Sequence, residues 1–170
     1  MSEANVAKEF TNLFAGHVDP MHQKQMHQLL ATGETITDCI NRAKNLALDL
    51  KAAKKDSTNF NFEDFKAKVE NFNTWLEKTK SDFPGYFKDI ESPFGDNLQE
   101  VDSKKFLSNI EEIIEKTQEL IARHQSQLPL LTLNLQEKES MFKLICEIMT
   151  ESLKQCNRSK NAIVHNQRSQ

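Results

Sequence analysis

The chain has 170 residues, of which 38% are hydrophobic and 28% are charged, and its formal net charge at pH 7 is −3. This length suits one ordinary domain, and the mixed charges exclude the basic face that nucleic-acid binding normally needs. Glycine and proline occur only four times each. Because sandwiches and barrels need many turns, this scarcity predicts an all-α protein built from few, long helices.

We expect neither a secretory signal nor a membrane-spanning helix. The N-terminal residues lack an apolar core, and no stretch approaches the roughly 18 apolar residues of a span. The three cysteines, Cys39, Cys146 and Cys156, form no CxxC pair and lie on or beside apolar helical stripes. Buried, reduced thiols are therefore expected, which favours the cytoplasm without excluding the nucleus.

The first predicted element is a short amphipathic helix over residues 3–15. Val6 and Phe10 lie along one of its faces, and Gly16 is expected to end it. Asp19 is followed by proline, which is typical of a helix start, so a long helix is predicted over residues 20–54.

The apolar and small positions of this long helix alternate steps of three and four, as in a heptad repeat. These positions are Met26, Leu29, Gly33, Ile36, Ile40, Ala43, Ala47 and Leu50. Several of these side chains are small, so the seam is thin. It can receive a bulky segment of the same chain or, alternatively, a helix of another protein.

A third helix is predicted over residues 61–81, with Asn61 near its start and Phe60 and Phe65 in the positions of a hydrophobic staple. The segment 82–101 that follows is rich in aromatic residues. A loop of this length is usually functional or disordered, and this one is too apolar for a disordered linker. We expect it to dock its aromatic side chains on the bundle, with partner binding as the alternative.

The helix predicted over residues 102–128 begins at an Asp102 cap and carries two adjacent apolar stripes. Pro129 then stops or kinks the chain within an apolar joint, residues 128–134. Asn134 and Glu137 resemble a capping box, which favours a hairpin and a new helix over one continuous kinked helix.

The last helix is predicted over residues 134–160, with a frayed tail at 161–170. One stripe along it contains Leu135, Phe142, Ile145, Met149 and Cys156. Met141, Leu144 and Ile148 widen this apolar face beyond what a two-stranded seam needs.

Known catalytic motifs are missing from the sequence. It has no glycine-rich phosphate loop, no HExxH, no GxSxG and no Glu-x-x-His pattern. The histidines do not stack at metal-ligand spacing, and Cys156, near Lys154 and Arg158, is the one plausible reactive thiol. We expect no enzyme activity, no cofactor and no metal.

Together these features predict a single domain over residues 1–170, an elongated antiparallel helical bundle or coiled coil of four main helices plus a short N-terminal helix. The predicted function is non-enzymatic protein–protein interaction, as a subunit, scaffold or adaptor of a larger intracellular assembly. The expected partners are helical proteins, in a homo- or hetero-oligomer. The candidate partner-binding residues are Leu128, Leu130, Leu131, Leu133, Tyr86, Phe87 and Phe94. The alternative is a cytosolic carrier of a lipid or other apolar small molecule.

Overall fold

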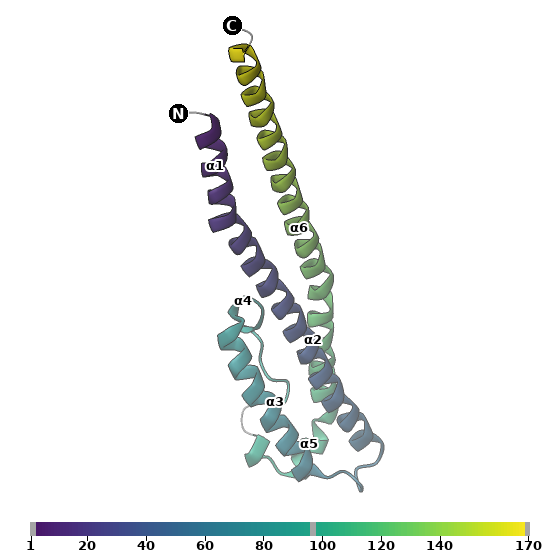
Figure 1. Cartoon of the computed structure of the whole chain (residues 1–170). Coiled ribbons are helices and arrows are strands. Elements are labelled where there is room, and N and C mark those ends of the chain that lie inside the picture. The colour runs from purple at the N-terminus through teal and green to yellow at the C-terminus, as the bar shows by residue number, and fades with distance from the viewer. Residues whose placement is uncertain (1–2, 96–97, 169–170) are drawn as a thin grey trace. The chain divides into compact units, whose positions relative to one another are not determined.

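The computed structural model describes residues 3–95 and 98–168, apart from the side chains of Glu3, Ala4, Val6, Ala7, Phe10 and Gln99. The expected face of Val6 and Phe10 therefore lies outside the described side chains. The described residues form helices and no strand, so the all-α class is confirmed (Figure 1). The helices are α1 (Glu3–Leu13), the π-helical η1 (Phe14–Val18), α2 (Asp19–Lys55), α3 (Phe62–Asp82), α4 (Pro84–Phe87), the 3-10 turn η2 (Leu98–Glu100), α5 (Ser103–Ser108) and α6 (Ile110–Arg168).

The chain divides into two compact units. One comprises Ala31–Leu130, which we call the core unit. The other comprises Met1–Leu30 together with Leu131–Gln170, which we call the helix-pair unit. Helices α2 and α6 each contribute residues to both units.

Nearly all burial lies in the core unit. Among the described residues, every buried side chain except Leu131 belongs to it. The segment 82–101 docks its aromatic residues there, as expected. Phe94 meets the rings of Phe65 and Phe72 edge-on, at centroid distances of 5.9 and 5.8 Å, and Phe87 is fully buried. Aromatic pairs favour this edge-to-face geometry, so the segment forms part of the core.

Local sequence signals explain where α3 and α5 begin. The Asn61 side chain caps α3 by accepting a hydrogen bond from the Asp64 N–H at 3.1 Å, and the rings of Phe60 and Phe65 pack 5.5 Å apart. The Asp102 side chain caps α5 by accepting from the Lys104 N–H at 2.7 Å. Each cap satisfies a backbone donor that the first helical turn leaves free.

The prediction of a hairpin at residues 128–134 is wrong. Helix α6 continues through this joint, and Pro129 lies inside the helix. Most of the helix expected over 102–128 and all of the helix expected over 134–160 therefore lie in the single helix α6. The predicted arrangement of four main helices is not confirmed. A proline inside a helix costs about 3 kcal/mol. Leu128 packs against the core and Leu131 is buried, so apolar contacts on both sides of the proline offset this cost.

Four further boundaries differ from the expectations. The chain stays helical through Gly16 and Asp19, and residues 161–168 extend α6 instead of fraying. Asp19 has helical dihedral angles and is not an N-cap, since its N–H donates to the Phe14 carbonyl in a π-helical turn. A glycine inside a helix costs only about 1 kcal/mol, which does not stop it. Residues 161–168 contain no glycine or proline. In contrast, Asn109 interrupts the helix expected over 102–128, between α5 and α6.

Candidate protein-interaction surface

The helix-pair unit is held together by aromatic rings on its two segments. Phe142 of α6 stacks on His22 of α2 with ring centroids 3.9 Å apart and on Phe14 of η1 at 5.8 Å. Phe14 and His22 are eight residues apart, which would place them about 80° apart around a regular α-helix. The π-helical turn absorbs an extra residue, so it brings both rings to the side that faces Phe142.

The face of α6 that contacts this N-terminal segment is only half covered. Leu131 is buried, but the other members of this inner face are half-buried. These are Leu135, Lys138, Phe142, Cys146, Met149, Leu153 and Cys156. The thiols of Cys146 and Cys156 are therefore not in a closed core, contrary to expectation.

A second apolar face of α6 is exposed. It carries Leu133, Met141, Leu144, Ile145 and Ile148, which we call the α6 stripe. Their exposed fractions run from 38% for Ile145 to 64% for Met141. Leu133 lies two helical turns before Met141, and Leu144 and Ile148 follow at steps of three and four, so the residues share one side of the helix.

The number of such residues distinguishes this unit from the rest of the chain. Ten of the twelve exposed large hydrophobic side chains of the described residues lie in the helix-pair unit, and only Leu48 and Leu130 lie in the core unit. Single exposed leucines are normal on protein surfaces, whereas a contiguous apolar patch marks an interaction site.

Acidic side chains accompany the α6 stripe. Glu137 lies four residues after Leu133 and four before Met141, so it belongs to the same face of the helix and is exposed. Glu147 and Glu151 follow one edge of the stripe and are also exposed. None of the three carboxylates forms an ion pair within the described residues, whereas Glu139, on another side, binds Lys143 at 3.4 Å.

The structure separates the sequence-predicted site residues into two groups. Leu130 and Leu133 are 68% and 52% exposed and stay candidates for partner binding. The other five are not available in this way. Leu128 and Tyr86 are half-buried against the core, and Leu131, Phe87 and Phe94 are buried. Phe87 and Phe94 of the 82–101 segment contact the core, so they do not form the expected partner-binding surface.

Met141, Leu144, Ile145 and Ile148 were not among the residues predicted to bind a partner. The signal that could have identified them is the excess width of the apolar face of the last helix. Two stripes on one helix need two neighbours, and the helix-pair unit supplies one.

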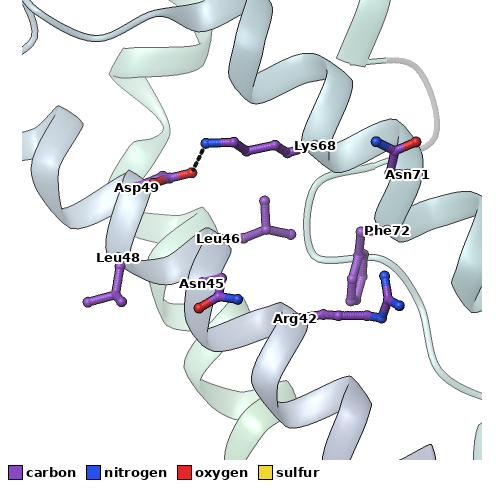
Figure 2. Close-up of a pocket in the computed structure, with 8 residues that line it drawn as sticks. All are labelled: Arg42, Asn45, Leu46, Leu48, Asp49, Lys68, Asn71 and Phe72. Carbon is purple, nitrogen blue, oxygen red and sulfur yellow. Dashed lines mark hydrogen bonds and ion pairs between the residues drawn. The ribbon is translucent and has the colours of Figure 1, made fainter.

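A pocket of about 480 Å³ lies between α2 and α3 in the core unit and is lined by Arg42, Asn45, Leu46, Leu48, Asp49, Lys68, Asn71 and Phe72. Figure 2 shows Lys68 extending from α3 toward Asp49 of α2. The Lys68 ammonium binds Asp49 and Asp64, each at 3.0 Å, and its hydrogen bond to Asp49 is the main reason that its pKa is raised. Lys68 is therefore a charged, paired group and not a nucleophile.

Arg42, at the other end of this pocket, is also engaged. It binds Asp38 at 2.9 Å and lies 4.9 Å from the centre of the Trp75 ring. The charged lining does not suit an apolar ligand, which the carrier alternative would need. Because the cations of the pocket already have partners, we find no acid–base pair poised for catalysis in it.

Two buried titratable groups of the core unit are inert at neutral pH. Burial, together with the adjacent Asp38 charge, raises the pKa of the Cys39 thiol to about 12, which suppresses the reactive thiolate. Burial lowers the pKa of His124, which packs 4.9 Å from the Phe87 ring. Its Nδ1 lies 2.7 Å from the Gln127 Oε1, and its buried Nε2 has no hydrogen-bond partner among the described residues.

Across the part of the chain that the structure describes, no three His, Cys, Asp or Glu side chains converge as metal ligands do. None of its helices combines the length and apolar content that crossing a membrane requires. Comparison with family models, with curated proteins and with solved structures finds no match to this chain.

Proposed function

We propose that the protein is a non-enzymatic interaction module that binds a helix of another polypeptide along the α6 stripe. The observation that carries this proposal is the second apolar face of α6, Leu133 to Ile148, which the described residues of the chain leave exposed. Amphipathic helices recognise such faces through apolar side chains spaced three and four residues apart. The stripe has this spacing.

A partner helix would complete a structure that the helix-pair unit begins. The proposal treats this unit as an antiparallel pair, with coiled-coil packing extended by a further helix on the exposed face of α6. A chain of this kind acts as a subunit, scaffold or adaptor. We place the protein in the cytoplasm, and the sole reason is that its cysteines are unpaired.

The size of the stripe sets the strength of the expected contact. Covering a half-exposed aliphatic side chain contributes on the order of 1 kcal/mol, so the five residues contribute on the order of 5 kcal/mol. Association costs roughly 4–15 kcal/mol in lost freedom. The stripe alone therefore supports a weak complex, and a stable one needs further contacts. Exposed Ile163, about 60° around the helix from Ile148, can supply one of them.

The test uses a stripe variant and a matched control in affinity purification with quantitative mass spectrometry. The variant is L144E/I148E, which places two carboxylates on the stripe. The control is Thr150→Glu, because Thr150 is exposed and lies about 200° around the helix from Ile148. We expect the proteins that co-purify with the unaltered chain and with T150E to be absent from the L144E/I148E sample. Each of these proteins, once purified, should bind the unaltered chain directly. Equal recovery by all three chains would contradict the proposal.

A further inference from the structure

The chemistry of the helix that would cover the α6 stripe, which we call the occupant, follows from Glu137, a carboxylate within the stripe. Glu137 lies on the apolar face of α6, one turn from both Leu133 and Met141, and makes no ion pair with the described residues. A helix that covers this face removes Glu137 from water. An uncompensated carboxylate in such a contact is costly, so the occupant must supply a positive charge at this point.

A second copy of the chain does not supply that charge. In a parallel pairing of two stripes, Glu137 faces Glu137, and the two carboxylates repel. In an antiparallel pairing centred on the stripe between Leu133 and Ile148, Glu137 faces Leu144. Both arrangements bury the carboxylate without a cation, so charge disfavours self-association through this face.

The edge of the stripe points to the same kind of occupant. Glu147 and Glu151 are exposed, lie beside Ile148 and form no ion pair within the described part of the chain. Lys143 lies near the same edge, one turn before Glu147, but it already pairs with Glu139 at 3.4 Å, and Lys154 and Arg158 come after the stripe has ended. Along its apolar length, α6 therefore offers negative charge to a neighbour, and basic residues flanking a partner's seam would complement it.

We propose that the occupant of the α6 stripe is a basic amphipathic helix from a different protein, with a Lys or Arg at the seam position that faces Glu137. This inference rests on the proposed function, because it identifies the partner of the same surface. The α6 stripe then forms a contact between two different proteins.

The test is a charge exchange with two designed peptides of three heptads, labelled with fluorescein and titrated by fluorescence anisotropy. Both carry Leu and Ile in the seam, and the central seam position is Lys in one peptide and Glu in the other. We expect the Lys peptide to bind the full chain at least tenfold more tightly than the Glu peptide. Glu137→Lys should reverse the preference. Glu115→Lys, the same charge change on the core unit, should leave the preference intact.

The outcomes separate this inference from the proposed function. If L144E/I148E abolishes binding but the two peptides bind the unaltered chain equally, the inference is overturned and the proposed function stands. If L144E/I148E binds both peptides as well as the unaltered chain does, or if neither peptide binds the unaltered chain, both are overturned. Sedimentation velocity measures whether the chain associates with itself. A dimer of the chain that L144E/I148E dissociates would make the occupant a second copy and overturn the inference.

Discussion

In the core unit, Phe72 is buried and meets both Phe94 and Trp75, whereas in the helix-pair unit Phe142 stacks on two rings and stays half-buried. Both side chains lie on amphipathic helices, α3 and α6. The difference is the number of segments around them, since the core unit brings α2, α3, the 82–101 segment and α6 together. Burial therefore follows the number of neighbours, and the described part of the helix-pair unit leaves one apolar face of α6 exposed.

The largest expected effect comes from the core unit. Phe72→Ala should lower the free energy of unfolding by about 3–5 kcal/mol, because it removes a buried ring and leaves a cavity. Urea titration followed by circular dichroism measures this change. The control is Leu48→Ala, an exposed position of the same unit, for which we expect a change below about 0.5 kcal/mol. Equal effects at the two positions would contradict the assignment of Phe72 to the core.

The equivalent change in the helix-pair unit should be smaller and local. Phe142→Ala removes the stack on His22 and Phe14, and since the ring is half-buried we expect a loss of about 1–2 kcal/mol. Hydrogen exchange should accelerate in α1 and in residues 131–168, while α3 keeps its protection. Uniform acceleration through both units would mean that they unfold together, which would remove the contrast between them.

The pH dependence of stability should be traceable to the core unit. Burial lowers the pKa of His124 below its ordinary value of 6.5, so the unfolded chain binds a proton more readily than the folded one. Stability is then fully present above pH 6.5 and declines as the pH falls from there through the folded pKa. Urea midpoints at pH 7.5 and 5.5 measure the decline.

The matched variant for this prediction is His124→Phe, which keeps a ring beside Phe87 but cannot titrate. It should show a smaller loss of stability between the two pH values, although the four other histidines remain. An identical loss in both chains would show that His124 is not the group responsible.

The smallest effect on folding is expected at the α6 stripe. L144E/I148E changes two exposed side chains, so we expect the free energy of unfolding to stay within about 0.5 kcal/mol of the unaltered value. Thermal unfolding of this variant beside T150E measures it. A loss as large as that of F142A would mean that the stripe is covered within the chain, and the contrast between the two units would then be absent.

Much of the helical content could be predicted because its signals are local. Asn61 and Asp102 cap helices in the structure through their own side chains, and Phe60 meets Phe65 within one turn. Pro129 could not be interpreted in this way. Its local cost is offset by the apolar contacts of Leu128 and Leu131 on its two sides, which the sequence near the proline does not reveal.

The candidate site was predictable only in part for the same reason. The excess apolar width of the last helix was visible from Met141, Leu144 and Ile148, but which stripe the chain covers depends on distant segments. The rings of Phe14 and His22 select the face of Phe142, and that choice uses the π-helical turn between them. Residues of the 82–101 segment were also ambiguous, because an aromatic side chain such as Phe87 suits a core and an interface equally well.

The central claim is that residues 133–148 of α6 present an uncovered face that receives another helix. Hydrogen exchange of the full chain with and without the Lys peptide tests it most directly. We predict that peptide binding slows exchange of the α6 amides between Leu133 and Ile148 and leaves α3 of the core unit unchanged. Unaltered exchange at residues 133–148 in the presence of bound peptide, or protection confined to the core unit, would contradict the claim.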